Sequence, residues 1–260
     1  MSILAVTGTD TGVGKTIVTA ALAAGPAARG ETVAVYKPTQ AGTEDGRGDV
    51  DVVRELAGVA TAVEGIRLAH PMAPVAAARR AGTTLPDLAE HVAAVEDLAA
   101  DHDHVLVEGA GGLLVELDGH GRTLADLSTA LSASAVVVCR SGLGTLNHTA
   151  LTVEALTRRQ IAVAGLVIGS WPAAPSEIER SNRAVLDHAS GAGLDRVSGD
   201  LPGPASGGLL GAVPDGAGRL DPARFRAEAP GWLRSPFDHR PVAPPRSARV
   251  CCVHTRSGPV

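Results

Sequence analysis

The start of the chain joins an apolar run to a glycine-rich turn, and this junction constrains the fold more than any other feature. Residues 3–6 are apolar, glycines recur through residues 7–14, and Gly14-Lys15-Thr16 leads into a second apolar stretch. A strand, a loop and a helix in this order form a phosphate site. Backbone N–H groups and the helix N-terminus face the phosphates, the lysine reaches their outer oxygens, and the threonine hydroxyl ligates Mg²⁺. The sequence therefore predicts nucleotide binding.

The spacing within this loop is unusual. Five residues separate Gly8 from Gly14, where the common pattern has four, and Thr9 stands at the expected glycine position. A chance glycine turn before a helix would seldom place Gly-Lys-Thr directly after a strand. We therefore interpret the segment as a variant phosphate-binding loop.

Composition excludes several classes of protein. The 260 residues are 45% hydrophobic, enough for a full core, while the net charge of −5 and the 2% aromatic content argue against nucleic-acid binding. No apolar run approaches the length of a membrane span, and no charged-then-apolar leader precedes the first strand. We therefore expect a cytoplasmic protein without nucleic-acid or membrane partners.

Short apolar runs alternate with longer amphipathic ones along the chain. The expected strands are 3–7, 32–36, 104–108, 135–139, 162–168 and 210–213. The expected helices are 15–29, 49–57, 85–100, 124–131, 145–159, 176–189 and 222–229. Continuous Val, Ile, Leu and Ala runs suit strands that are buried on both faces, and intervening helices imply parallel crossovers. The pattern predicts a three-layer, doubly wound α/β fold of the P-loop NTPase type, with a mostly parallel sheet.

The end of the chain differs from the rest. Residues 235–246 carry four prolines and no apolar periodicity. We expect one P-loop domain over residues 1–232 and a Pro-rich, disordered tail over residues 235–260.

Charged residues follow two of the expected strands. Lys37 closes the second strand, where an ammonium group could stabilise a phosphoryl group in transfer. Glu108 ends an apolar strand and precedes Gly109-Ala-Gly-Gly112, whose glycines let the backbone approach a ligand. With Thr16 and one aspartate, Glu108 would supply the hard oxygen ligands that Mg²⁺ prefers.

The aspartate in this set is not fixed by the sequence. Asp49 lies just after Gly46-Arg-Gly48, at the start of an expected helix, and could equally be a helix cap. Asp51, two positions later, is a rival for the same role. Both alternatives stay open at this point.

Several motifs occur in the order found in one enzyme family. Residues 7–16, Lys37-Pro38, Val107-Glu-Gly-Ala-Gly-Gly112 and Gly144-Thr-Leu-Asn-His-Thr149 together resemble the dethiobiotin synthetase family. The similarity continues through residues 165–169 and 210–214, so it covers roughly residues 1 to 230. A Thr-Asp-Thr phosphate loop is characteristic of that family, which accounts for the extra loop residue.

The resemblance implies an ATP-dependent ligase that closes a ring. Its substrates would be 7,8-diaminononanoate and CO2, and its products dethiobiotin, ADP and phosphate. Because the protein would contribute little covalent chemistry, positioning and charge stabilisation should dominate catalysis. The resemblance also implies a homodimer with shared active sites.

The resemblance assigns a role to each matching position. The catalytic residues would be Thr11, Lys15 and Lys37, and the Mg²⁺ ligands Thr16, Asp49 and Glu108. The nucleotide would contact Gly12, Val13, Gly14, Lys15, Thr16, Glu108, Gly109, Ala110, Gly111, Gly169, Ser170, Val213 and Pro214. The substrate would contact Thr11, Lys37, Ala41, Gly144, Thr145, Leu146 and Asn147, the last four across the dimer interface.

Three positions depart from the family pattern. Many relatives carry a hydroxyl residue in place of Ala41, so Thr39 or Thr43 substitutes for it or the contact is absent. Gly12 replaces an acidic residue of several relatives. Ser170 follows the strand where the family often has an asparagine that reads adenine. We therefore hypothesise relaxed base selection, with another triphosphate such as CTP accepted.

Two other classes of protein share this kind of loop. Cobyrinate-type amide ligases need a second, glutaminase domain that the remaining length cannot hold. A partition-type ATPase, which acts as a nucleotide-switched dimer, normally carries a lysine early in the loop, where this chain has Thr9-Asp-Thr-Gly12. The partition-type ATPase is the alternative interpretation.

Overall fold

The computed structural model describes residues 1–43, 46–188 and 207–237. The strands are β1 (Ser2–Gly8), β2 (Val33–Ala41), β3 (Thr61–Leu68), β4 (His104–Gly112), β5 (Ser134–Cys139), β6 (Val163–Trp171) and β7 (Leu209–Pro214). The helices are α1 (Lys15–Ala28), α2 (Asp49–Ala57), α3 (Pro74–Ala81), α4 (Leu88–Asp101), α5 (Leu124–Ala130), α6 (Thr145–Arg158), α7 (Glu177–His188) and α9 (Pro222–Glu228). Two short 3₁₀ helices, Ala217–Arg219 and Ala229–Gly231, flank α9.

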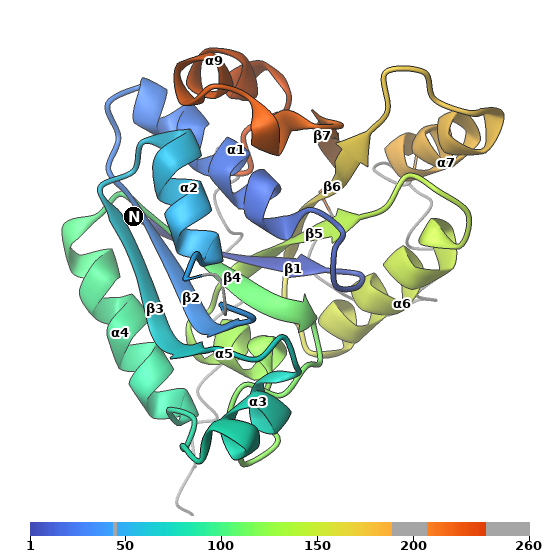
Figure 1. The fold of residues 1–260 in the computed structure, drawn as a ribbon. Helices are drawn as coiled ribbons and strands as arrows, with labels where there is room; N and C mark the ends of the chain where they lie inside the picture. The colour runs from blue at the N-terminus through green and yellow to red at the C-terminus, as the bar shows by residue number, and fades with distance from the viewer. Residues whose placement is uncertain (44–45, 189–206, 238–260) are drawn as a thin grey trace, which may run out of the picture.

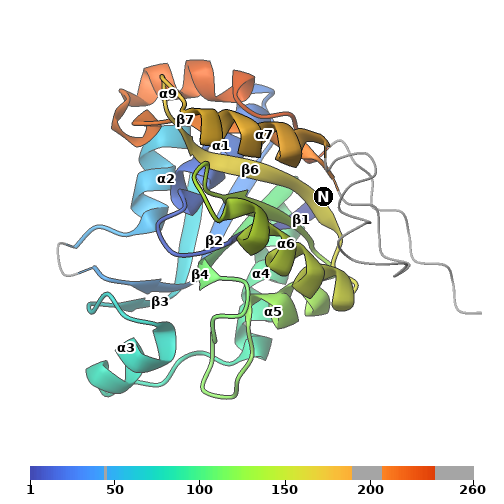
Figure 2. The same ribbon diagram turned by 90° about the vertical axis from the view of Figure 1, so that its right-hand side faces the viewer.

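The strands form one seven-stranded sheet in the order β3-β2-β4-β1-β5-β6-β7, and all of its neighbouring strands run parallel. Helices lie on both faces of the sheet (Figures 1 and 2). The predicted three-layer P-loop fold is confirmed. The carboxyl ends of β1, β2 and β4 meet at one edge of the sheet, where such folds bind their ligands.

Two apolar layers hold the helices on the sheet. Helices α1, α2 and α9 pack on one face, and α4, α5 and α6 pack on the other. Strand residues alternate between the layers, as Val35 does with Tyr36. The layer beneath α1 is rich in alanine, and Phe225 of α9 supplies a fully buried ring that meets Trp232 edge-on at 5.2 Å. Small side chains therefore let α1 lie close to the sheet.

Strand β3 and helix α3 were not predicted. Strand β3 carries Glu64, Gly65 and Arg67, so it lacks the continuous apolar run of the other strands. It lies at the edge of the sheet, where one face and one side meet solvent and charged residues are tolerated. Helix α3 has only eight residues and begins at Pro74, which suits the first turn of a helix. Helix α3 contributes Pro74 to the pocket wall, and β3 pairs with β2, the strand that carries Lys37.

Strand β2 extends five residues beyond its predicted end at Tyr36. The extension pairs with β3 up to Ala41, which is partnered by Leu68. The ladder skips Pro38, because proline has no N–H to donate. Lys37 therefore lies inside a strand instead of closing one.

The last described residues are part of the fold. Phe237 packs against the core layer beneath α1 and lies with its ring 4.3 Å from the ring of His104, centroid to centroid. Most of the expected tail, residues 238–260, lies outside the described residues. Within the described part of the chain, none of the helices combines the length and the apolarity that crossing a bilayer requires.

Candidate active site

The phosphate loop lies directly on the backbone of β6. Gly12 and Gly14 have positive φ angles of 72° and 98°, which glycine adopts without strain. A Cβ atom at Gly14 would lie 2.6 Å from the Gly169 carbonyl oxygen, and one at Gly169 would collide with the carbonyl oxygen of Val13. The position of the loop therefore depends on glycine in both contacting segments.

Lys15 begins α1 and reaches back over the loop. Its Nζ atom donates a hydrogen bond to the Asp10 carbonyl oxygen at 3.0 Å, and its side chain lines the pocket. Burial, with the nearby Lys37 ammonium, lowers the pKa of Lys15. An incoming phosphate would stabilise this ammonium, which is poorly solvated and is repelled by the neighbouring Lys37.

Lys37 lies between two carboxylates. Its Nζ atom is 2.8 Å from Glu108 Oε1 and 2.5 Å from Asp49 Oδ2, and it also donates to the Gly109 carbonyl oxygen at 3.3 Å. The residue is only 3% exposed. Burial opposes the charged form, but the two carboxylates outweigh it and raise the pKa of Lys37. The lysine is therefore held as a cation.

The carboxylates come from separate elements that meet at the sheet edge. Glu108 is 1% exposed on β4 and accepts a hydrogen bond from Thr16 Oγ1 at 2.9 Å. Asp49 is the first residue of α2, and its N–H donates to Gln40 Oε1 at 2.6 Å. Burial works to raise the pKa of Asp49, but the Lys37 ammonium outweighs it and lowers that pKa.

These oxygen atoms fit a magnesium ion that also binds phosphate. The described residues contain no cluster of three or more His, Cys, Asp or Glu side chains suited to a metal. Mg²⁺ does not need one, because it commonly uses one or two carboxylates and takes phosphate oxygens and water as its other ligands. Thr16, Asp49 and Glu108 supply one hydroxyl and two carboxylates. In the structure the Lys37 ammonium lies between the two carboxylates, so positive charge already occupies the place that suits a cation.

A pocket of about 710 Å³ opens beside this cluster. One part of its wall is polar and comes from the phosphate loop, Lys37, Asp49 and Glu108. Another part is largely apolar and consists of Pro71–Pro74, at the start of α3, together with Val115. The pocket can therefore hold a charged group and an aliphatic chain at once.

Eleven of the 21 sequence-predicted site residues line this pocket, and ten do not. Those that line it are Thr11, Gly12, Gly14, Lys15, Thr16, Lys37, Ala41, Asp49, Glu108, Ala110 and Gly111. Those outside its lining are Val13, Gly109, Gly144, Thr145, Leu146, Asn147, Gly169, Ser170, Val213 and Pro214. Gly169 lies under the loop, and Ser170 Oγ donates to Asp215 Oδ1 at 2.9 Å. Residues 144–147 begin α6 and Leu146 is exposed.

The structure also distinguishes the residues between which the sequence could not choose. Asp51 accepts a hydrogen bond from the Gly48 N–H at 2.9 Å and pairs with arginines, whereas Asp49 contacts Lys37. Thr43 donates to the Leu68 carbonyl oxygen at 3.3 Å. Thr39 lines the pocket, and its buried hydroxyl has no hydrogen-bond partner among the described residues.

Sequence reasoning missed several residues of this region. Gln40 binds the backbone of Asp49, and Pro71–Pro74 form the apolar wall. Gln40 stands between the singled-out Lys37 and Ala41, so its position was a usable signal. The wall belongs to the segment after the missed strand β3, and no local pattern placed it near the phosphate loop.

Comparisons with known proteins agree with this geometry. The family model described as an AAA domain matches residues 3–213. The chain is 51% identical to the ATP-dependent dethiobiotin synthetase of Streptomyces avermitilis over 236 residues, which are 90% of this chain and 92% of the relative. It is 50% identical to the enzyme of the same name from Rhodococcus jostii, again over 236 residues, with 90% and 96% covered.

A solved structure supports the fold alone. The septum site-determining protein MinD of Pyrococcus horikoshii, solved with Mg-ADP, superposes with a TM-score of 0.52 at 19% identity, covering 91% of this chain and 93% of that one. At that identity the likeness extends to architecture and no further. The sequence relatives decide the family, because their identity is high and extends over nearly the whole length of both chains. The chain therefore belongs to the ATP-dependent dethiobiotin synthetase family.

Proposed function

We propose that the protein carboxylates and cyclises 7,8-diaminononanoate with CO2 to dethiobiotin, releasing ADP and phosphate. One observation carries the proposal beyond family membership. Lys15, Thr16, Lys37, Asp49 and Glu108 converge on one pocket that also has an apolar wall. That arrangement suits a reaction between a nucleotide and a ligand with an aliphatic chain.

The proposed reaction has three steps. One amine of the substrate adds to CO2 and gives a carbamate. A carbamate oxygen then attacks the γ-phosphorus atom and releases ADP, which leaves a mixed carbamic–phosphoric anhydride. The second amine attacks the carbonyl carbon, closes the ureido ring and expels phosphate. Each step displaces or builds an anionic oxygen, so preorganised positive charge is the main contribution expected from the protein.

The side chains divide this work by position. Lys15, at the start of α1, would contact the outer phosphate oxygens, and Lys37 would stabilise the carbamate and the transferring phosphoryl group. Thr11 would lie beside the reacting end of the substrate, since it lines the pocket close to the phosphate loop. Burial of both lysines strengthens their interaction with anions, because little water competes.

Thr16, Asp49 and Glu108 would hold Mg²⁺, which would neutralise charge on the phosphates when bound. In the structure Lys37 occupies the space between Asp49 and Glu108. When those carboxylates bind another cation, the Lys37 amine would be free to turn toward the phosphoryl group. The ion pair would thus keep the amine charged and close until it is needed.

The nucleotide base would be selected weakly. The Ser170 hydroxyl already donates to the Asp215 carboxylate, so a serine stands where a base-reading amide would supply two hydrogen bonds. Backbone groups near Val213 and Pro214 would form the remaining contacts. ATP is the expected co-substrate, and a pyrimidine triphosphate such as CTP should also bind.

A homodimer would complete each active site. Residues 144–147 lie outside the lining of their own chain's pocket, and this part of the chain carries exposed apolar side chains at Leu143, Leu146 and Leu151. Leu143 is 87% exposed, and several exposed apolar side chains in one stretch of the chain are typical of an interaction surface. This surface would pack against a second copy and bring the start of α6 to the carboxylate of the partner's substrate. We expect the enzyme to work in the cytoplasm.

Dethiobiotin formation by the purified protein, with each of the four triphosphates supplied in turn, tests this proposal. We expect product with ATP, and binding of at least one other triphosphate within about tenfold of ATP. A preference for ATP above that factor over every other triphosphate would refute relaxed base choice only. Triphosphate turnover without the diamine and bicarbonate would support the partition-type ATPase instead.

A further inference from the structure

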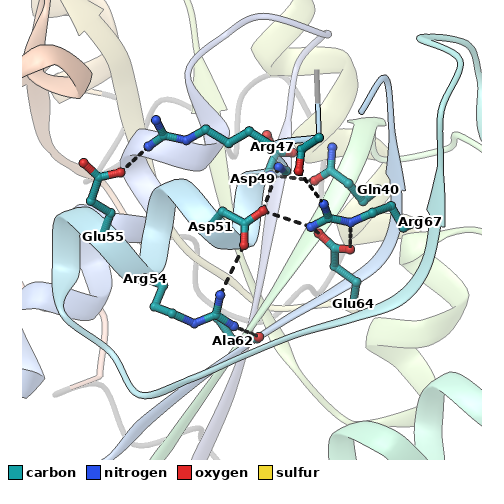
Figure 3. Close-up of polar contacts among 11 residues, drawn as sticks. Gln40, Arg47, Asp49, Asp51, Arg54, Glu55, Ala62, Glu64 and Arg67 are labelled. Carbon is teal, nitrogen blue, oxygen red and sulfur yellow. Dashed lines mark hydrogen bonds and ion pairs between the residues drawn. The ribbon is translucent and has the colours of Figure 1, made fainter. Parts of the chain in front are cut away.

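The first turn of α2 is held by two backbone hydrogen bonds to side chains. The Asp49 N–H donates to Gln40 Oε1 at 2.6 Å, and the Gly48 N–H donates to Asp51 Oδ2 at 2.9 Å (Figure 3). Both N–H groups belong to the start of the helix, where the helix itself provides no acceptor. Asp49, the residue that contacts Lys37, therefore lies in a turn fixed from both sides.

Arg67 of β3 ties this turn to the edge of the sheet. Its Nη1 atom donates to the Gly46 carbonyl oxygen at 2.9 Å, and its Nη2 atom donates to Asp51 Oδ2 at 2.9 Å. Its Nε atom donates to Glu64 Oε2 at 2.6 Å, which orients the guanidinium plane (Figure 3). The Arg67 side chain thus binds the loop before α2, the residue that caps α2, and Glu64 of its own strand β3. A lysine carries its three donors on a single nitrogen atom, so it cannot reproduce this planar fork.

An irregularity in β2 and β3 makes these contacts possible. Lys37 and Gln40 both contact Asp49, although they are three positions apart and regular alternation would put them on opposite faces. Pro38 lies between them, and Gly65 lies beside it on β3. A Cβ atom at Gly65 would be 2.6 Å from the Pro38 carbonyl oxygen, so only glycine fits. Glu64 and Arg67, which are also three positions apart, likewise contact each other on β3, so regular alternation is interrupted on both strands here.

The same contacts would add little to the stability of the fold. The side chains of Arg67 and Asp51 are 37% and 34% exposed, and ion pairs this accessible to water are weak. Their geometry is nevertheless specific, because the Arg67 guanidinium donates two hydrogen bonds to the turn that carries Asp49. The contacts thus point to a role in placement.

We propose that Arg67, acting through Asp51 and Gly46, is a positioning residue that presents the Asp49 carboxylate to Lys37 and to the cation of the bound nucleotide. The inference rests on the proposed function, because it assumes that a metal–nucleotide complex occupies the pocket. Partners that orient a metal ligand typically change metal affinity by about 10- to 100-fold when they are lost. Arg67 should therefore act on metal-dependent binding, while metal-free binding and folding change little.

Calorimetry with a non-hydrolysable ATP analogue tests this inference on the full chain. Arg67→Gln should weaken binding of the analogue in Mg²⁺ about 10-fold and leave its binding in EDTA unchanged. Arg67→Lys should behave like Arg67→Gln, because charge alone does not restore the fork. Arg224→Gln is the matched control, since it removes another exposed ion pair, with Glu228, on α9. It should bind as the wild type does.

A double variant separates positioning from a general effect. In an Asp49→Asn background, Arg67→Gln should add no further loss of Mg²⁺-dependent binding, because its effect passes through Asp49. Additive losses, or equal losses with and without Mg²⁺, would overturn the inference. If the wild type itself binds no metal–nucleotide complex, the proposed function fails. If the wild type binds and Arg67→Gln matches it, only the positioning role fails.

Discussion

Lys37 and Asp49 form an ion pair, with 2.5 Å between Nζ and Oδ2, that joins the middle of β2 to the first residue of α2. The same ammonium lies 2.8 Å from Glu108, so one monovalent cation is shared by two carboxylates and leaves one of their two negative charges unbalanced within the trio. A divalent cation with its own phosphate ligands would compete for both carboxylates. The pair therefore links the lysine expected to act on the phosphoryl group to the ligands expected to hold the metal.

Removing the Lys37 amine should abolish most of the catalysis. Lys37→Ala should lower turnover by a factor on the order of 10² or more, as expected for the loss of a preorganised charge. The variant also leaves Asp49 and Glu108 without their cation, so Mg²⁺ should raise its melting temperature more than that of the wild type. Dethiobiotin formation and thermal melts with and without Mg²⁺ check both effects. Near-normal turnover would remove Lys37 from the catalytic residues.

Asp49 and Asp51 should differ in their effect on the metal requirement. Asp49→Asn should raise the Mg²⁺ concentration for half-maximal activity at least about 10-fold, because a carboxylate ligand is lost. Asp51→Asn should have a smaller effect, since it weakens only the support of the turn. Activity measured across a Mg²⁺ titration compares the two variants. An Asp51→Asn effect as large as that of Asp49→Asn would instead make Asp51 the ligand.

A single methyl group under the phosphate loop should disturb nucleotide binding. In Gly169→Ala the new Cβ atom would collide with the Val13 carbonyl oxygen, so the loop must move. Overpacking of this kind typically costs about 1–3 kcal/mol. Because the displaced backbone is the phosphate loop, nucleotide affinity should fall at least about 10-fold.

The control for this variant is Gly119→Ala, at which a Cβ atom would meet nothing within 4 Å. It should bind nucleotide as the wild type does when both variants are titrated by calorimetry. Unchanged affinity in Gly169→Ala would mean that the loop can shift without harm to the phosphate site.

A buried histidine should make stability depend on pH. His91 is fully buried, its Nδ1 atom lies 2.7 Å from the Tyr36 hydroxyl, and burial lowers the pKa of His91 from its ordinary 6.5. Below that pH the unfolded chain takes up a proton that the folded chain refuses. The free energy of unfolding should therefore fall as the pH drops from 6.5 toward the folded-state pKa, by up to about 1.4 kcal/mol per pH unit.

Urea unfolding of the wild type and of His91→Gln between about pH 7.5 and 5.5 isolates this contribution. Other groups titrate alike in both proteins, so the difference between their slopes belongs to His91. The glutamine variant should lose less stability over this range. Parallel slopes would show that the folded protein accommodates a charged His91.

Central strands were predictable because their environment is uniform. Residues such as Val136 and Leu106 lie in strands covered on both faces, so the sequence carries uninterrupted apolar runs there. Strand β3 has no such apolar run, because it lies at the sheet edge and its Glu64 and Arg67 bind polar partners. Its pairing with β2 is a long-range contact, and a local sequence pattern does not predict such a contact.

The candidate site was predictable where function and local structure share a motif. Lys15 and Thr16 follow a loop, and Glu108 follows the apolar run of a buried strand, so their positions follow from the elements they belong to. Strand β4 continues to Gly112, so Glu108 lies inside it and not at its predicted end. Asp49 and Asp51 could not be separated, because the choice depends on which of them faces Lys37 across the sheet edge. That in turn depends on the altered facing at Pro38, which alternation alone does not predict.

The ring contact between Phe237 and His104 has a practical consequence. His104 is the first residue of β4, and it also meets Ser2 at the start of β1, so Phe237 lies where these strands begin. The pocket lies at the opposite ends of the same strands. A reporter protein or an immobilisation handle joined behind Phe237 would thus start on the far side of the sheet from the catalytic cluster. Immobilised enzyme could then be assayed with the mouth of its pocket facing the bulk solution.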